Sequence, residues 1–135
     1  MTKKILLDTN FIMLCSQFKV DIFSEIERVC DFNYGLYVLD KTRDELKDII
    51  KNQKGKHKAA ANVALQLLKI KKVKAIKTGS LKHTDDVIVD YSIKEGYIVA
   101  TQDKGLKRTL INHGLSVIIL KQKKTLAIVN DKGFN

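Results

Sequence analysis

The sequence of 135 residues contains no proline and no low-complexity stretch. Linkers between domains are commonly rich in proline, glycine or polar residues, so their absence predicts a single domain over residues 1–135. That length is sufficient to bury a full hydrophobic core. The apolar fraction of 44% and the charged fraction of 30% are typical of a soluble globular protein.

Long apolar runs are also absent. No run approaches the roughly 20 residues that a helix needs to span a bilayer. Before Asp8 the chain has only three strongly apolar residues in succession, too few for the core of a signal peptide. We therefore expect an intracellular, cytoplasmic protein without a membrane partner.

Cysteine is scarce. Cys15 and Cys30 stand alone, with no CxxC pair and no cysteine–histidine spacing of the kind that binds zinc. We interpret both as buried apolar residues, which predicts neither a disulfide nor a zinc site.

Acidic residues are outnumbered, because 25 Lys and Arg stand against 15 Asp and Glu, a formal charge of +10. This excess favours a polyanionic partner, with nucleic acid first and an anionic membrane surface second. We expect a mobile basic loop at residues 51–58 and a basic helix after Asp103. Ordinary solvated faces are the alternative interpretation of these charges. The candidate RNA contacts are Lys54, Lys56, Lys58, Lys104, Lys107 and Arg108.

Apolar runs and amphipathic segments alternate along the chain. The order predicts a three-layer α/β/α sandwich around a mostly parallel sheet of about five strands. The expected strands are residues 5–7, 36–39, 73–76, 97–101 and 115–120, with 125–129 as an added edge strand. The expected helices are residues 11–18, 21–30, 41–51, 59–70, 85–95 and 104–113, the first capped by Asn10 and the fifth by Thr84.

Two acids follow predicted strands. Asp8 comes directly after the first strand, and Asp103 comes two residues after the fourth. Ligands of α/β sheets bind in the crevice beyond the carboxyl ends of the strands, where the two side chains would meet if their strands are neighbours. Asp85 and Asp86 open a helix, and Glu45 lies in the early turns of another. Taken singly, Asp8 could be a helix cap and Glu45 a residue of a solvated face.

Carboxylates gathered in one crevice repel one another and need a cation to compensate them. Ligands that are all oxygen, without histidine or cysteine, select hard ions, which here means Mg²⁺ or Mn²⁺. Such an ion neutralises charge on a phosphate and orients a water, as phosphoryl chemistry requires. The residues therefore indicate a magnesium or manganese site that acts on phosphate esters.

Three segments resemble the PIN-domain nucleases: LLDTN at residues 6–10, an Asp-x-x-Ile helix start at 85–88, and IVATQD at 98–103. The resemblance covers essentially the whole chain and implies a PIN-like fold. The metal ligands that it implies are Asp8, Glu45, Asp85 (or the adjacent Asp86) and Asp103, with Thr9, Asn10 and Thr101 as supporting polar residues.

Within that superfamily, YIVATQDKGLK at residues 97–107 is similar to the eukaryotic and archaeal PIN nucleases of small-subunit ribosomal RNA processing, with VapC-type toxins next. The resemblance implies an endoribonuclease that depends on Mg²⁺ or Mn²⁺ and releases 3′-hydroxyl and 5′-phosphate ends. A PIN-fold RNA-binding or ribosome-assembly factor with little turnover is the alternative from a different class. The expected partners are RNA, with pre-rRNA as the candidate, a second copy of the chain in a homodimer, and an antitoxin in the toxin-type case.

Overall fold

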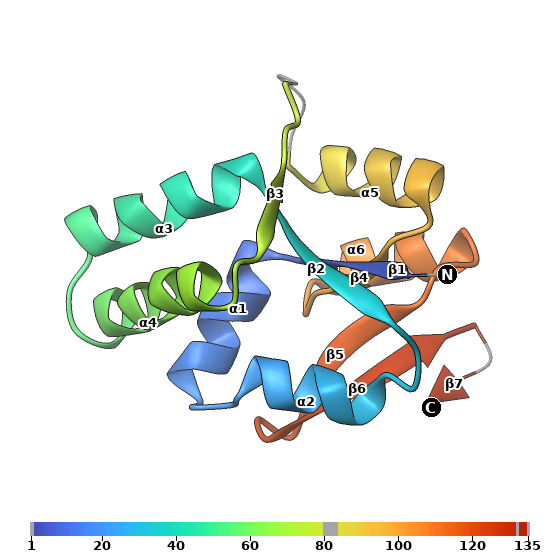
Figure 1. Ribbon diagram of the computed structural model, residues 1–135, viewed down its shortest axis with the longest axis horizontal. Helices are drawn as coiled ribbons and strands as arrows, with labels where there is room; N and C mark the ends of the chain where they lie inside the picture. Colours follow the sequence, from blue (N-terminus) through green and yellow to red (C-terminus); the bar gives the residue numbers. More distant parts are fainter. Residues whose placement is uncertain (1, 80–83, 132, 135) are drawn as a thin grey trace.

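A sheet with helices on both faces forms the centre of the molecule (Figure 1). The computed structural model describes residues 2–79, 84–131 and 133–134. Within these residues the strands are β1 (Lys3–Leu7), β2 (Tyr34–Leu39), β3 (Lys74–Ile76), β4 (Ile98–Ala100), β5 (Val117–Lys121), β6 (Thr125–Asn130) and β7 (Gly133–Phe134). The helices are α1 (Thr9–Gln17), α2 (Ile22–Val29), α3 (Asp40–Asn52), α4 (Lys56–Ile70), α5 (Thr84–Glu95) and α6 (Lys104–Asn112).

β1 lies in the middle of the sheet. It pairs in parallel with β2 on one side and with β4 on the other, so that Ile5 lies opposite Leu36 and Ile98 in the two registers. Ile5 and Leu7 belong to one core cluster, whereas Leu6 belongs to the other. All three side chains are at most 1% exposed. This confirms the prediction of a strand that is buried on both faces.

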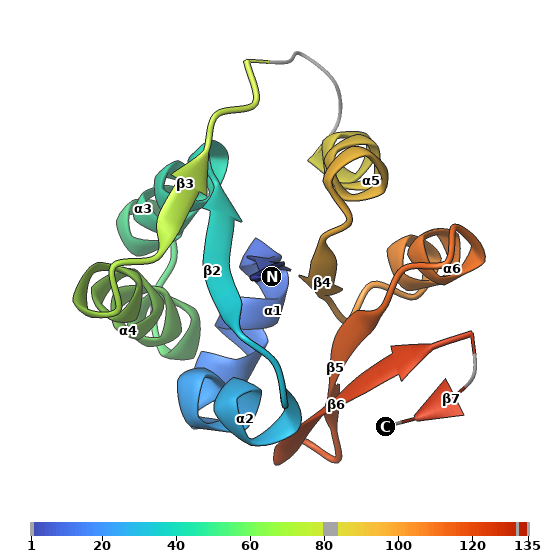
Figure 2. The ribbon, with the colours of Figure 1, turned by 45° about the vertical axis from the view of Figure 1, so that its right-hand side comes forward.

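Two layers of helices cover the sheet (Figure 2). The helices α1 to α4 enclose the larger core, to which Phe11, Leu46 and Leu68 contribute. The helices α5 and α6 cover the opposite face with side chains such as Ile88 and Leu110. The arrangement is the predicted three-layer α/β/α sandwich.

The described part of the sheet has seven strands in the order β3-β2-β1-β4-β5-β6-β7. We expected about five with an added edge strand at residues 125–129, and β6 confirms that added strand. The first five in this order are parallel to their neighbours, which confirms the mostly parallel sheet. β6 then turns back antiparallel to β5 through Gln122 and Lys123, whose φ angles are 52° and 59°. The short β7 continues this antiparallel end of the sheet. A strand of two residues leaves no periodic pattern, so it was not foreseen.

The basic segment 51–58 is mostly helical, which corrects the expected mobile loop. α3 continues to Asn52 and α4 begins at Lys56, so only residues 53–55 connect the two helices. Gly55, with a φ of 67°, adopts the left-handed conformation at this reversal. Lysine is a good helix former, so the alanine-rich helix α4 extends back through Lys56 and Lys58.

α1 begins two residues earlier than expected. It starts at Thr9 with Asp8 at the N-cap position, so Asn10 lies inside the first turn and is not the cap. Among the described residues, the Asp8 side chain forms no capping hydrogen bond, which leaves its carboxylate available beyond the strand. α5 starts at Thr84, the expected cap, but the Thr84 side chain and residues 80–83 lie outside the described part of the chain.

Pairs of side-chain hydrogen bonds connect the loop after β4 and the helix α2 to the antiparallel end of the sheet. The Gln102 amide donates to the Leu120 carbonyl at 3.2 Å and accepts from the Leu120 N–H at 2.6 Å. On α2, Arg28 donates to the Leu126 carbonyl at 2.9 Å, and Glu25 accepts from the Leu126 N–H at 2.9 Å. The loop after β4 and the helix α2 are therefore each tied to the β5–β6 hairpin.

Cys15 and Cys30 are buried and free, as expected. Burial raises the pKa of the Cys15 thiol to about 12 and that of Cys30 to about 11, so both remain protonated and inert at neutral pH. Across the described residues, none of the helices combines the length and apolarity required to cross a bilayer.

Candidate active site

β1 and β4 end side by side, and each is followed by an acid. The Asp8 N–H donates to the Ala100 carbonyl at 3.1 Å, so the pairing of the two strands continues to Asp8. Asp103 ends the short connection from β4 and lies at the N-cap position of α6. The expectation that the strands preceding Asp8 and Asp103 are neighbours is thus confirmed.

Thr101 joins these two acids. Its hydroxyl donates to Asp8 Oδ2 at 2.9 Å and accepts from the Asp103 N–H at 3.2 Å. Thr101 is fully buried, and both bonds are partly buried. Thr101 therefore acts as a supporting polar residue between the two strand ends.

Asp8 occupies an environment that disfavours its charge. Burial raises the pKa of the Asp8 carboxyl above its ordinary value of 3.8, and repulsion by Asp85 and Asp103 raises it further. The hydrogen bond from Thr101 acts in the opposite direction without reversing the shift. A positive charge placed among these carboxylates would relieve the strain on Asp8.

Asp103 is held at the start of α6. Its Oδ1 accepts from the Leu106 N–H at 2.8 Å, which makes Asp103 the N-cap of the helix. The exposed Asp103 carboxylate is thereby fixed by the helix start and by the bond from its own N–H to Thr101.

Glu45 is tied to the same end of the sheet through Thr9. The Thr9 hydroxyl donates to Glu45 Oε1 at 3.3 Å and lies 2.9 Å from the Thr42 hydroxyl. Burial raises the pKa of the Glu45 carboxyl, and repulsion by Asp8 adds to the shift. Glu45 is exposed on α3, as expected for a solvated helix face, but its bond to Thr9 and the repulsion by Asp8 also make it part of the acidic group. The role of Thr42 was missed, although its place three residues before Glu45 puts both on one helix face.

Asp85 and Asp86 lie in the first turn of α5. Asp85 is half-buried and Asp86 is exposed, and it is repulsion by Asp85 that contributes to the raised pKa of Asp8. A cavity of about 370 Å³ between α5 and α6 is lined by Asp85, Asp86, Asp90 and Asp103. The cavity opens these four carboxylates to solvent, whereas Asp8 does not line it.

The donor set of these carboxylates fits a hard divalent cation, because all its ligands are oxygens and two of its acids have raised pKa values. Within the described residues, no three acidic, histidine or cysteine side chains stand close enough together to hold a metal ion as they are placed. Binding of a cation would therefore require the carboxylates to turn toward one another.

The predicted RNA contacts fall into two groups. Lys104, Lys107 and Arg108 follow Asp103 on α6, next to the acids. The second group, Lys54, Lys56 and Lys58, lies at the α3–α4 turn, beyond the end of α3 that is about 10 Å along the helix from Glu45. Asn10 is exposed and lines a cavity with Gln17, Gln53 and His57 toward that same turn.

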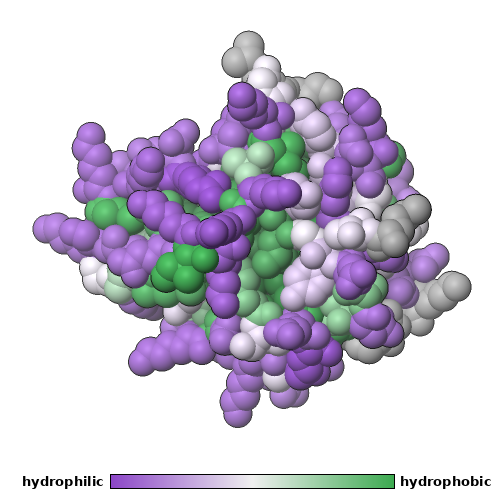
Figure 3. Space-filling view, in the orientation of Figure 1, coloured by the Kyte–Doolittle hydropathy of each residue, from purple (hydrophilic) through white to green (hydrophobic). Residues whose placement is uncertain are grey.

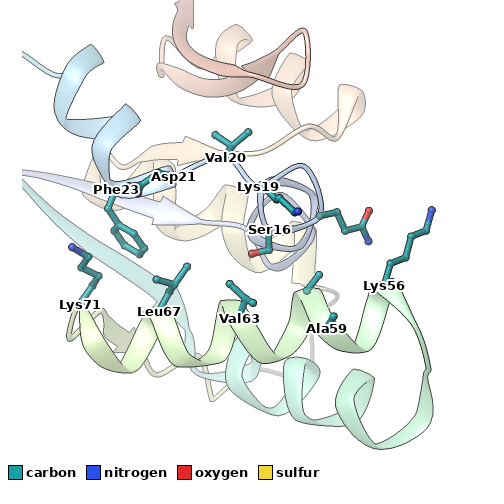
Figure 4. A pocket seen from close by; sticks show the side chains of 12 residues that line it. Ser16, Lys19, Val20, Asp21, Phe23, Lys56, Ala59, Val63, Leu67 and Lys71 are labelled. Atoms are coloured by element: carbon teal, nitrogen blue, oxygen red, sulfur yellow. The ribbon is translucent and has the colours of Figure 1, made fainter.

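A larger cavity lies away from Asp8 and Asp103. It is an apolar groove of about 680 Å³ between α4 and the connection from α1 to α2 (Figure 4). Ala59, Val63 and Leu67 recur along one face of α4 and lie opposite Val20 and Phe23. On the side of α3 and α4, Figure 3 shows hydrophobic patches within a mostly hydrophilic surface. The lysines that flank the groove are Lys19, Lys56 and Lys71.

A parallel α/β/α sandwich with acids at the carboxyl ends of two adjacent central strands is the architecture of the PIN-domain proteins. Residues 5–123 match the sequence model of the family described as PIN like domain. The protein therefore belongs to the PIN-like domain family, and the resemblance drawn from its motifs is confirmed.

Similar proteins cover nearly the full chain. Ribonuclease VapC4 of Methanocaldococcus jannaschii is 35% identical over 128 residues, which are 93% of this chain and 95% of that protein. Ribonuclease VapC9 of Archaeoglobus fulgidus is 30% identical over 122 residues, 90% and 85% of the two chains. Among solved structures, the PIN domain endonuclease Utp24 superposes with a TM-score of 0.75 at 22% identity, covering 93% of this chain and 90% of that one. This last likeness concerns the fold.

Proposed function

We propose that the protein is an endoribonuclease that depends on a divalent metal ion. The observation that carries the proposal is the group of carboxylates around Asp8, where burial and mutual repulsion raise the pKa of Asp8 and of Glu45. A fold gains nothing from such repulsion unless a cation compensates it. The two relatives that match most of the chain are both named ribonucleases.

Asp8, Glu45, Asp103 and either Asp85 or Asp86 would hold Mg²⁺ or Mn²⁺. When bound, the ion supplies positive charge for the phosphate and for the departing oxygen of an RNA phosphodiester. The repulsion between Asp85 and Asp8 favours Asp85 over Asp86 as the third ligand.

The other residues of the site bind and orient. Thr101 would hold the Asp8 carboxylate and the Asp103 backbone in fixed positions through its two hydrogen bonds. The basic start of α6, with Lys104, Lys107 and Arg108, would contact the phosphates of the RNA on the side of Asp103.

Cleavage of single-stranded RNA tests the proposal. We expect cleavage with Mn²⁺ or Mg²⁺ and none in EDTA. Asp8→Asn and Asp103→Asn should each abolish cleavage but leave RNA binding intact or tighter, because a negative charge is removed near the phosphates. Asp44→Asn, at an exposed carboxylate on α3, is the matched control and should cleave normally. Wild-type turnover in either site variant would place the reactive centre elsewhere, and binding without turnover in the wild type would favour the RNA-binding or assembly factor.

Ribosomal RNA processing is the biological role that the sequence motifs favour. In that role, a pre-rRNA fragment should be cut at one site, whereas unrelated RNA of the same length should be cut slowly. This selectivity would be measured by mapping the 5′-phosphate ends that the wild type forms and comparing them with those formed by Asp8→Asn. Cuts scattered evenly over both RNAs would contradict it.

A VapC-type toxin is the second candidate, favoured by the names of the two relatives. A toxin requires an antitoxin, and the apolar groove of α4, flanked by lysines, would suit an acidic amphipathic segment of one. The protein should then arrest growth when expressed alone, and a small gene immediately upstream should neutralise it. Val63→Glu in the groove should prevent neutralisation while leaving RNA cleavage unchanged. Normal growth on expression of the active enzyme would exclude the toxin role.

A further inference from the structure

Two buried threonine hydroxyls, from Thr42 and Thr9, lie on the interior side of Glu45. Thr42 and Thr9 come from the starts of α3 and α1, and their side chains are 2% and 6% exposed. Their hydroxyl oxygens lie 2.9 Å apart, and the Thr9 hydroxyl is also 3.3 Å from Glu45 Oε1. The three polar groups thus form one chain that leads from the buried interior to an acid of the site.

The number of protons fixes the direction of this chain. A threonine hydroxyl carries a single proton, and an ionised carboxylate only accepts hydrogen bonds. Thr9 must therefore donate its proton to Glu45, and it has none left for Thr42. The 2.9 Å bond between the hydroxyls is consequently donated by Thr42 and accepted by Thr9.

The arrangement also couples two helices. Thr42 and Glu45 are three residues apart on α3 and so lie on the same helix face. Both contact Thr9, the first residue of α1 and the neighbour of Asp8. Because Thr42 donates to the Thr9 hydroxyl, the proton of that hydroxyl points toward Glu45.

We propose that Thr42 is a positioning residue of the active site, whose buried hydroxyl orients the Thr9 hydroxyl and thereby holds Glu45 in place beside Asp8. This inference rests on the proposed function, because it concerns the readiness of Glu45 to receive a cation. Thr42 itself touches neither RNA nor the reacting atoms.

The test compares Thr42→Val, which keeps the shape and removes the hydroxyl, with Thr42→Ser, which keeps the hydroxyl and removes the methyl group. The first readout is the Mn²⁺ concentration that gives half of the metal-induced rise in melting temperature, measured for each variant against its own metal-free melt. The second is the Mn²⁺ dependence and the KM of RNA cleavage. Thr125→Val, at an exposed residue of β6, is the control for the same chemical change away from the site.

We expect Thr42→Val to raise the Mn²⁺ midpoint about three- to tenfold in both assays, because supporting residues of metal sites typically change affinity by about tenfold or more and Thr42 acts through Thr9. Thr42→Ser and Thr125→Val should remain within about twofold of the wild type. The KM for RNA should not change in any of them.

Two outcomes would overturn the inference. An unchanged Mn²⁺ midpoint in Thr42→Val would show that the hydroxyl does not act on the site. An equal loss in Thr42→Ser would assign the effect to packing of the methyl group. Both leave the proposed function standing, whereas a wild type that neither cleaves RNA nor responds to Mn²⁺ refutes the proposed function and the inference together.

Discussion

Asp8→Asn is the substitution that most directly tests whether the charge of Asp8 destabilises the metal-free fold and binds the metal ion. The amide has nearly the shape of the carboxylate, and its oxygen can still accept the hydrogen bond from Thr101. The substitution removes a negative charge that is disfavoured by loss of solvation and by repulsion from Asp85 and Asp103. The variant therefore separates the electrostatic role of Asp8 from its packing.

The effect on metal-free stability depends on pH, and its sign follows from the raised pKa. A carboxyl whose pKa in the folded state lies above its unfolded value of about 3.8 contributes stability below pH 3.8, and this is lost as the pH rises through the folded-state pKa. Asn has no such loss. Without metal, Asp8→Asn should therefore melt at a higher temperature than the wild type at pH 7, and the advantage should disappear as the pH is lowered toward 3.8.

The effect on the metal response has the opposite sign. An ion present at about 100 times its Kd adds about 2.7 kcal/mol to the stability of the folded state. For 135 residues the entropy of unfolding is about 0.28 kcal/mol per degree, so the wild type should gain about 10 °C. If the loss of one ligand weakens binding about 100-fold, the same ion concentration adds only about 0.4 kcal/mol, or between about 1 and 2 °C.

Thermal melts of the wild type, Asp8→Asn and the control Asp44→Asn, with and without Mn²⁺ at fixed ionic strength, measure both effects. Asp44→Asn should respond to Mn²⁺ as the wild type does. Equal metal responses in the wild type and Asp8→Asn would mean that Asp8 is not a ligand. A lower metal-free melting temperature for Asp8→Asn at pH 7 would refute the reasoning about the buried charge.

Three further predictions concern the rest of the site. Thr101→Val should destabilise the fold by about 2–3 kcal/mol, because Asp8 loses a buried hydrogen bond to a charged group, and Thr101→Ser should restore most of it in a denaturant titration. Asp85→Asn should lose most of the RNA cleavage activity and Asp86→Asn much less; the reverse order would move the third ligand by one residue. Arg108→Ala should raise the KM for RNA and flatten its dependence on salt without changing turnover at saturating RNA, and an unchanged salt dependence would exclude a phosphate contact.

The sequence allowed the layers of the fold to be predicted because their signals are local. The three apolar residues before Asp8 and the strand that precedes Asp103 are read directly from the order of residues, and both strands were confirmed. That these strands are neighbours could only be stated as a condition, since pairing depends on contacts distant in sequence. The motif resemblance supplied Glu45, which hydropathy alone would have left on a solvated face.

What the sequence did not reveal depends on the rotation and the ends of helices. The contact between Thr42 and Thr9 exists only because the starts of α1 and α3 lie together, and no residue near Thr42 indicates this. The loop expected at residues 51–58 was wrong because the strong helix-forming tendency of lysine competes with the loop signal of Gly55. Asn10 was predicted as the cap of α1 because asparagine is common at that position, but the helix begins at Thr9 and Asp8 is at the N-cap position.

The hydrogen bond between Thr101 and Asp8 joins residues that are 93 positions apart in the chain. Contacts of such long range form slowly, because the entropy of closing the intervening chain must be overcome before they add any stability. During synthesis β1 emerges first and can pair with β2, but its other edge waits for β4. A chain that ends before β4 still contains Asp8, Glu45 and Asp85 but lacks Asp103 and Thr101, so the two sides of the proposed site cannot meet until most of the chain has left the ribosome.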